Sequence, residues 1–431
     1  MPTNLKIDVF DPVHQHAAFL FGKRFDDIPG LTIDPTVHVY HSESNPLTAF
    51  DTKVANSGAE ALGYKFQRHP SSFPLEDMLK SRGDILVLAS PNHSKLDVLA
   101  HTAGTGYRLI LADKPWVIEP ERTDEVQELL DRATHRGTIL QDIMTERHEL
   151  GTIVQMCLMQ NAELFGELTT GNPEHPALTK KSIHILDKSH QGIVRPLEYF
   201  DVGWQGEGIV DVTAHLVDMA NMMVRPNSAI APEDIALVEQ YARRWATEVP
   251  ASNLMAMTKG RSYGLRGSLP VMTNGSFVYK LDGHWVGIEV VWNLQGEDDE
   301  HYSTTLESKA TIIVEKGPQD KHQRIYVKPT NGESSTDFMK ALSTQVGTLT
   351  RRGITGASIG AYVTNRNGYE VIIPELHFTN HFAHFTEVAE QAFRYVAGTE
   401  PFPREVEYSR LLTKYHLTTQ ALKAARANMG R

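Results

Sequence analysis

Lys114 is the first residue in the chain whose type and place suggest catalysis. It follows the apolar run 109–112 in the sequence Asp113-Lys114-Pro115. In a doubly wound sheet, ligands bind beyond the carboxyl ends of the strands, so an ammonium group there can polarise a hydroxyl or carbonyl oxygen. Most lysines are instead solvated and form surface salt bridges. The strand-end position favours a catalytic role for Lys114.

Asp211 and His215 form a second candidate pair. They are four residues apart in the segment Ile209–Met219, and on a helix both would project from one face about one turn apart. A histidine can take the proton of a substrate hydroxyl near neutral pH, while the carboxylate orients it or binds a neighbouring hydroxyl. The alternative is a helical Asp-His pair at the surface.

The elements that must position these side chains alternate in the first part of the chain. Apolar or β-rich runs predict strands, and amphipathic stretches between them predict helices over His93–Ala103 and Glu121–Arg136. Alternation of this kind predicts a Rossmann-like parallel sheet, with its chemistry in the residues that follow each strand. The predicted strands are Lys6–Phe10, Val37–Tyr40, Ile85–Ala89, Leu109–Ala112 and Thr138–Gln141.

The pattern changes after about residue 150. Strand-like runs follow one another with hairpin breaks over 275–315, which predicts a mainly antiparallel, open-faced sheet, and two helices close the chain at His381–Val396 and Arg404–Ala427. We therefore expect a Rossmann-like dinucleotide-binding domain over 1–148 and a substrate-binding and oligomerisation domain over 149–431. The stretch Gln345–Asn365 is expected to be the most mobile loop.

Composition excludes several classes of function. The formal net charge of −11 gives no attraction for nucleic acid. The N-terminus lacks a signal-peptide pattern, and no stretch approaches the roughly 20 apolar residues of a membrane span. A single cysteine, Cys157, rules out an intramolecular disulfide and fits a reducing compartment. We expect a soluble, cytoplasmic protein.

Three motifs together carry a resemblance to a known family. They are Ser90-Pro91-Asn92-His93, Asp113-Lys114-Pro115, and Asp211-x-x-x-His215 after Gly206-Glu207-Gly208. In this combination the chain resembles the glucose–fructose oxidoreductase and inositol dehydrogenase family, NAD(P)-dependent enzymes that act on sugars and polyols. The segments Leu111–Ile118, Gln141–Glu149 and Phe200–Met219 further look like a poorly characterised oxidoreductase branch of that family with a distinct C-terminal domain. The resemblance implies Lys114, Asp211 and His215 as the catalytic set, with hydride leaving the carbon whose hydroxyl His215 deprotonates.

The cofactor-binding turn departs from the usual pattern. A Rossmann first turn carries glycines that let the backbone approach the diphosphate, whereas this turn, from Asp11 to Ala17, has none. Its histidine side chains and a helix N-terminus can still bind anionic oxygen. We predict NAD or NADP as cofactor, bound by Asp11, His14, His16, Ser90, Pro91, Asn92, Asp113, Lys114 and Pro115.

Three further residues are predicted to contact substrate. Glu146 follows the fifth strand, His184 lies on a polar strand, and Trp204 is suited to stacking on a sugar ring. Imidazole groups also suit Zn, Mn or Fe, so His14, His16 and His184 are an alternative metal site.

These observations favour an NAD(P)-dependent oxidoreductase of a sugar, glycoside or polyol. The alternatives are a lyase, hydratase or isomerase of a keto-sugar, with or without a metal, and a sugar or dinucleotide sensor without turnover. The expected partner is a small carbohydrate or polyol, with neither nucleic acid nor membrane. An open-faced sheet also predicts a homodimer or higher homo-oligomer.

Overall fold

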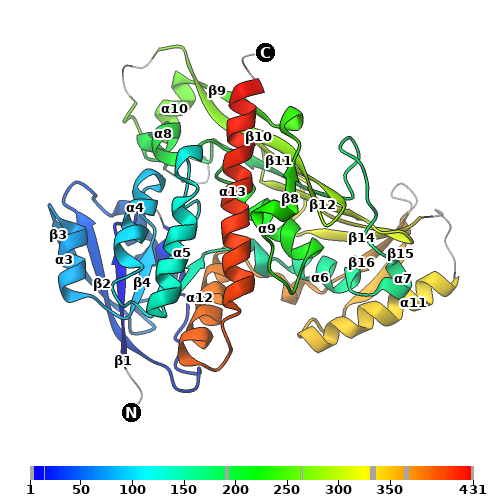
Figure 1. Cartoon of the computed structure of the whole chain (residues 1–431), viewed down its shortest axis with the longest axis horizontal. Helices are drawn as coiled ribbons and strands as arrows, with labels where there is room; N and C mark the ends of the chain where they lie inside the picture. Colours follow the sequence, from blue (N-terminus) through cyan, green and yellow to red (C-terminus); the bar gives the residue numbers. More distant parts are fainter. Residues whose placement is uncertain are drawn as a thin grey trace. The chain divides into compact units, whose positions relative to one another are not determined.

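The computed structural model describes residues 4–13, 15–189, 194–262, 264, 266–330, 336–363 and 368–428, and they form two compact units (Figure 1). Unit 1 comprises Met1–Thr145, Gly203–Gly206 and Asn380–His416. Unit 2 comprises Glu146–Val202, Glu207–Thr379 and Leu417–Arg431. The chain thus forms most of unit 2 and then returns to unit 1 over Asn380–His416.

Unit 1 contains a six-stranded parallel sheet in the order β3-β2-β1-β4-β5-β6. This is the doubly wound order of dinucleotide-binding folds, and it confirms the predicted Rossmann-like sheet. The strands are β1 (Asn4–Phe10), β2 (Thr32–Ser42), β3 (Lys65–Ser71), β4 (Ile85–Leu88), β5 (Leu109–Ala112) and β6 (Ile139–Asp142). Five of the six coincide with predicted strands; β3 does not.

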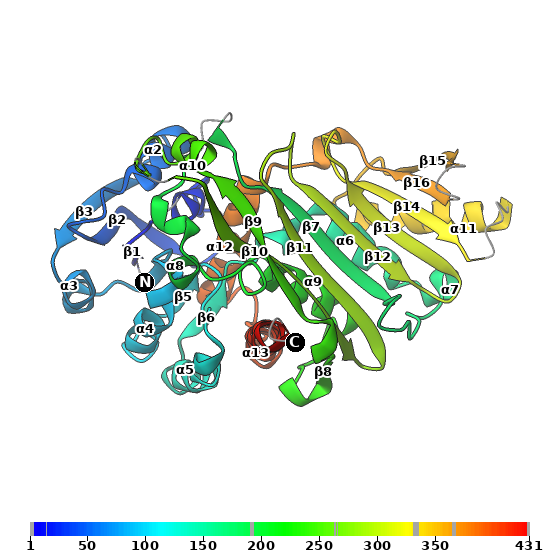
Figure 2. The same ribbon diagram turned by 90° about the horizontal axis from the view of Figure 1, so that it is seen from above.

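Helices cover both faces of this sheet (Figure 2). In α5, Val126, Leu129, Leu130 and Ala133 are buried at helical spacing, and Gly137 ends the helix with a φ of 72° that glycine adopts without strain. The described α-helices of unit 1 with four or more residues are α1 (His16–Phe19), α2 (Thr48–Ser57), α3 (Pro74–Ser81), α4 (Asn92–Thr102), α5 (Glu125–Arg136), most of α8 (Val202–Gln205), α12 (His381–Ala397) and the first part of α13 (Arg404–Asn428).

Unit 2 is built on a ten-stranded sheet that is antiparallel except where β7 pairs with β11. Its path is β15-β16-β14-β13-β12-β7-β11-β10-β8, and β9 also pairs with β10. This confirms the predicted mainly antiparallel sheet. The strands are β7 (Leu178–Ile185), β8 (Ile235–Leu237), β9 (Arg243–Pro250), β10 (Ser268–Leu281), β11 (His284–Asn293), β12 (Glu300–Leu306), β13 (Ala310–Lys316), β14 (Arg324–Pro329), β15 (Ser358–Val363) and β16 (Gly368–Ile372).

One face of this sheet packs on helices (Figure 2). Along β11, Val286, Ile288 and Val290 are buried while the residues between them are half-buried, which is the period-two pattern of a sheet with a single core face. The packed helices are α6 (Leu150–Met159) on β13 and β14, α9 (Thr213–Val224) on β7, β10 and β11, and α11 (Thr336–Gly347) on β15.

The prediction that Gln345–Asn365 forms a loop is wrong, because the described part of this stretch contains regular secondary structure. Its first residues end α11, a 3₁₀ turn follows at Thr348–Arg352, and Ser358–Val363 form β15. Residues 364 and 365 lie outside the described residues. Leu349 and Ile354 are buried in the core beside α6, which explains why a stretch rich in Gly and Thr is held in place.

A lysine is buried in the middle of the core face of unit 2. The row that crosses the sheet consists of Phe277, Ile288, Lys180, Ser303, Val314, Ile325 and Val371, all buried. Gln155 on α6 covers the two polar residues of this row. The Oε1 atom of Gln155 accepts hydrogen bonds from Ser303 Oγ at 2.8 Å and from Lys180 Nζ at 3.5 Å. Burial lowers the pKa of Lys180 to about 7, and the charge of Glu146 opposes that shift.

No helix within the described residues is long and apolar enough to cross a lipid bilayer.

The buried lysine gives a stability prediction. Below pH 7 Lys180 is protonated in the folded and unfolded chain alike, so the full cost of burying its charge is present; between pH 7 and 10.5 only the unfolded chain keeps the proton, and stability rises with pH. We expect Lys180→Met to raise the free energy of unfolding by about 1–3 kcal/mol at pH 6.5. By pH 9.5 the gain should be smaller, measured by urea unfolding.

Lys181→Met is the matched control for this experiment. Lys181 is the next residue on β7, is half-exposed on the opposite face and forms an ion pair with Glu289 at 3.2 Å. Its replacement should change stability by about 0.5 kcal/mol or less at both pH values. A Lys180→Met variant less stable than wild type at both pH values would contradict the account of a buried charge.

Candidate active site

Asp11 shapes the first turn of unit 1, directly after β1. Its backbone φ is 40°, in the left-handed region that glycine usually supplies and that Asp tolerates better than most residues. Its Oδ1 accepts hydrogen bonds from Asn45 Nδ2 at 2.8 Å and from the backbone N–H of Ser42 at 3.3 Å, and its own N–H donates to Tyr40 O at 2.8 Å. The turn therefore forms without a glycine because the loop after β2 holds Asp11.

Asp113 links the ends of two segments at the carboxyl edge of the sheet. Its Oδ2 lies 2.9 Å from Nδ1 of His16, the first residue of α1, and its Oδ1 accepts the backbone N–H of Lys114 at 3.0 Å. Asp113 is buried, whereas Lys114 and His16 are half-buried. The structure thus brings three of the predicted cofactor residues together. His14 lies outside the described residues.

The third predicted strand end carries Ser90, Pro91 and Asn92. Asn92 begins α4, its Nδ2 donates to Gln205 O at 2.8 Å, and its Oδ1 accepts Lys95 Nζ at 2.7 Å. Lys95 is fully buried, so this ion–dipole contact fixes the orientation of the Asn92 amide. The contact to Gln205 also tethers the segment that contains Trp204, whose ring lies 5.8 Å from that of His93.

The polar groups of this edge fit a nicotinamide dinucleotide in their chemistry. Ser90 is 1% exposed, and its Oγ has no hydrogen-bond partner in the described chain. A buried hydroxyl left unpaired costs about 1–3 kcal/mol, which a ligand or water would offset. The N-terminus of α4 and the imidazole of His16 are further groups that attract phosphate oxygens.

Asp211 and His215 lie in unit 2 and are both buried. The predicted helix over Ile209–Met219 begins later than expected: α9 starts at Thr213, and Asp211 belongs to the preceding turn, where its N–H donates to Glu207 O at 3.1 Å. Gly208 explains the difference, because a Cβ there would lie 1.7 Å from Thr273 O on β10. This close approach to β10 imposes a turn before the helix can start.

Glu207 and Arg147 are ion-paired side chains that sequence reasoning did not assign. Glu207 pairs with Arg244 at 3.0 Å and with Arg426 at 3.1 Å, which anchors the turn before α9. Arg147 forms a bidentate pair with Asp218 of α9, with N–O distances of 2.6 and 2.8 Å. Asp218 is three residues after His215, so helical spacing from His215 could have identified Asp218 as a residue of interest.

Glu146 and His184 are the predicted substrate residues of unit 2. Glu146 is buried and acts electrostatically on Lys180, as described above. His184 Nε2 lies 2.6 Å from Ser182 Oγ, its Nδ1 lies 3.3 Å from Asp299 Oδ2, and its ring stacks on Trp292 at 4.7 Å. The structure thus surrounds His184 with partners inside unit 2.

A small charged network continues from His184. Burial alone would raise the pKa of Asp299, but the hydrogen bond and charge of His184, together with Lys188 at 2.6 Å, outweigh it and lower that pKa. Burial, and then the proximity of His184, lowers the pKa of His301 to about 4, so His301 is neutral near pH 7.

The two described residues of the alternative metal site belong to different units. His16 belongs to unit 1, His184 belongs to unit 2, and His14 is not described. Among the residues that the structure describes, no group of three or more His, Cys, Asp or Glu side chains is placed to hold a metal ion.

Comparisons with known proteins bear on both units. Residues 154–426 match the family model described as "Putative oxidoreductase C terminal domain". A crystal structure of a putative oxidoreductase from Parabacteroides merdae ATCC 43184 is 29% identical, with a TM-score of 0.88 over 99% of this chain and 98% of that chain. No curated protein matches the sequence.

Two more distant structures share the fold. Levoglucosan dehydrogenase, in complex with NADH and L-sorbose, is 12% identical with a TM-score of 0.63, over 99% of this chain and 98% of that chain. The WlbA dehydrogenase from Bordetella pertussis, in complex with NADH and UDP-GlcNAcA, is 16% identical with a TM-score of 0.57, over 99% and 97%.

The family match covers well over half of the chain, and the 29% identical structure extends the similarity to nearly its whole length. The prediction of an oxidoreductase is thereby confirmed at the level of the family, while the branch stays a prediction. The chain belongs to the oxidoreductase family that carries this C-terminal domain.

Proposed function

We propose that the protein is an NAD- or NADP-dependent dehydrogenase or reductase of a sugar or polyol. The observation that carries this proposal is the Asp113 carboxylate, which holds His16 and the Lys114 backbone at the carboxyl edge of a sheet of order 3-2-1-4-5-6. Levoglucosan dehydrogenase and WlbA, which share the fold, are both dehydrogenases whose structures hold NADH and a sugar or sugar nucleotide, and they support the same substrate class.

The dinucleotide would be held by the polar edge of unit 1. The residues proposed for this are Asp11, His14, His16, Ser90, Pro91, Asn92, Asp113, Lys114 and Pro115. Ser90 Oγ would gain the partner that the described chain does not offer it, and the start of α4 suits an anionic group. When bound, the nicotinamide ring supplies the acceptor or donor of the hydride.

The remaining steps belong to the side chains of the protein. In the oxidative direction, a ring nitrogen of His215 accepts the hydroxyl proton as the C–O bond becomes a carbonyl, and in the reductive direction it returns that proton. The Lys114 ammonium group is proposed to stabilise negative charge that develops on a substrate oxygen. Asp211 is proposed to bind a neighbouring hydroxyl or to orient the histidine.

The substrate hydroxyls need further partners. We propose Glu146, His184 and Trp204 for this role, as hydrogen-bond acceptor, donor or acceptor, and stacking surface. The pair between Arg147 and Asp218 ties the segment of Glu146 to α9, the helix of His215, so it would position both residues within unit 2.

Replacement of the proposed catalytic residues should reduce turnover without unfolding the protein. We expect Lys114→Met and His215→Ala each to lower kcat about a hundredfold or more, the scale of a lost polarising or proton-transfer group, with KM for the polyol changed much less. Steady-state kinetics with NAD or NADP and a panel of sugars and polyols measures this.

Matched controls are Lys65→Met and His135→Ala, which replace exposed residues on β3 and α5. They should keep activity within twofold of wild type. Asp211→Asn should be less severe than His215→Ala if Asp211 only orients or binds; an equal or larger loss would identify Asp211 as the base. Activity within a few-fold of wild type in a folded Lys114→Met or His215→Ala variant removes that residue from the catalytic set.

Cofactor binding is tested separately from turnover. Titration calorimetry of NADH and NADPH into wild type should give a Kd in the micromolar range, and His16→Ala should raise that Kd about tenfold to a hundredfold, since a lost hydrogen bond to a charged group costs about 1.5–3 kcal/mol. His101→Ala, an exposed histidine on α4, should bind as wild type does.

Elemental analysis of the same samples tests the metal-assisted alternative. A stoichiometric metal, no measurable binding of either dinucleotide, and inactivation by a chelator that added metal reverses would replace the dehydrogenase with a metal-dependent lyase or isomerase. Dinucleotide binding without turnover on any sugar or polyol would favour a sensor.

A further inference from the structure

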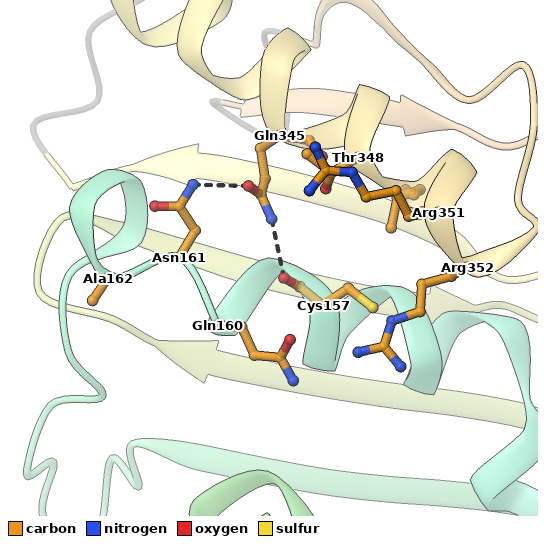
Figure 3. Close-up of a pocket in the computed structure, with 9 residues that line it drawn as sticks. Cys157, Gln160, Asn161, Ala162, Gln345, Thr348, Arg351 and Arg352 are labelled. Carbon is orange, nitrogen blue, oxygen red and sulfur yellow. Dashed lines mark hydrogen bonds between the residues drawn. The ribbon is translucent and has the colours of Figure 1, made fainter.

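A pocket in unit 2 lies apart from α9 and its histidine. It has a volume of about 360 Å³ and is formed by the carboxyl end of α6, the residues that follow it, the end of α11 and the 3₁₀ turn Thr348–Arg352 (Figure 3). These elements pack over β13, β14 and β15, whereas α9 packs over β7, β10 and β11. Small-molecule sites occupy about 300–1,000 Å³, so the pocket is large enough for a small metabolite.

Hydrogen bonds make the back of this pocket rigid. Gln345 Nε2 donates to Cys157 O at 3.1 Å, and its Oε1 accepts Asn161 Nδ2 at 2.8 Å (Figure 3). Asn161 in turn caps the short helix that follows, and Thr348 Oγ1 donates to Gln345 O at 2.6 Å. The wall is therefore built before any ligand arrives, which lowers the entropic cost of binding.

The charge of the pocket is positive and uncompensated. Arg351 and Arg352 have no ion pair and no hydrogen bond to another described residue, and no Asp or Glu lines the pocket. By contrast, Arg147, Arg225 and Arg244 of unit 2 are each paired with at least one carboxylate. Both side chains of the pocket, Arg351 and Arg352, are exposed, so their charges are solvated and accessible to a solute anion.

The two arginines approach the pocket from one side. Figure 3 shows Arg352 extending from the 3₁₀ turn toward the Cys157 side chain, and Arg351, its neighbour on the same turn, also lines the pocket. Basic residues also interact favourably with the carbonyl end of a helical turn. That interaction, however, explains neither the preformed hollow nor the absence of an acidic residue from its lining.

We propose that this pocket binds a small oxyanion, the phosphate or carboxylate group of a metabolite, through Arg351, Arg352 and the Gln160 amide. Guanidinium groups recognise such groups with paired N–H donors, and the Gln160 side chain, also in the lining, adds an uncharged donor. The site uses none of the proposed catalytic residues, so the proposal stands independently of the dehydrogenase activity.

Cys157 provides a reporter inside the pocket. It is the single cysteine of the chain, is half-buried and lines the hollow. Burial raises the pKa of its thiol, and the charge of Arg352 acts in the opposite direction. Alkylation of the protein by a thiol reagent therefore measures access to this pocket without interference from other thiols.

The test compares an anionic with a neutral reagent, iodoacetate and iodoacetamide, by mass spectrometry of the intact protein. Arg351→Gln, Arg352→Gln and the double variant should lower the ratio of the iodoacetate rate to the iodoacetamide rate, by threefold or more in the double variant, because the positive field that attracts the anion is lost. Arg261→Gln, an exposed arginine elsewhere in unit 2, should leave the ratio unchanged.

Protection experiments then identify the ligand class. Inorganic phosphate, glucose 6-phosphate or citrate should slow the iodoacetamide reaction saturably in wild type, at least threefold for the best of them, while glucose should not. The strongest protector distinguishes free phosphate, a phosphorylated sugar and a carboxylate. The double variant should lose this protection. Absence of protection by all three anions in wild type, or equal protection in the double variant, overturns the proposal, as does an unchanged rate ratio in a folded double variant.

Discussion

The buried carboxylate of Asp113 is the interaction on which the proposed cofactor edge depends. One oxygen fixes His16 at the start of α1, and the other accepts the N–H of Lys114, so two chain segments 97 residues apart are held to one strand end. A buried charge needs such partners, because an isolated carboxylate away from water is strongly unfavourable. Asp113 and the end of β5 therefore fix the backbone position from which the Lys114 side chain extends.

Hydrophobic pattern predicted the parts of the fold that are decided by local burial. The strands β1, β4 and β5 and the helices α5 and α12 are amphipathic or wholly apolar, and their boundaries, like those of β6 and α13, fall within a few residues of the prediction. β3 was missed because its sequence, KFQRHPS, is polar and it lies at the edge of the sheet, where pairing with β2 alone defines it. The stretch from Gln345 was missed for a related reason: Leu349 and Ile354 are too few to show a period, yet tertiary packing against α6 orders them.

The candidate site divides in the same way between local and long-range causes. The motifs that contain Asn92, Lys114 and His215 are contiguous in sequence, so their placement at strand ends or on a helix could be predicted. The pairs that hold them could not, because Arg147 and Asp218 are 71 residues apart and Asn92 bonds a carbonyl 113 residues away. The start of α9 was misplaced by four residues because the approach of Gly208 to β10 leaves no trace in helical periodicity.

Helix α6 connects two polar features of unit 2 that have opposite electrostatic status. Gln155 faces the sheet and accepts hydrogen bonds from Lys180 and Ser303, and burial disfavours the charge of Lys180. Cys157 and Gln160 line the pocket of Arg351 and Arg352, whose charges are solvated and unpaired. A lysine in a core row is most stable when neutral, so it needs no counterion, whereas an arginine cannot lose its proton and is stabilised only by an anion or by water. Since an oxyanion would bind only the folded unit, it would stabilise α6 and the 3₁₀ turn in proportion to RT ln(1 + [L]/Kd). The carboxyl end of α6 thus carries residues that an oxyanion would contact, while the buried side of the same helix carries the glutamine that contacts Lys180.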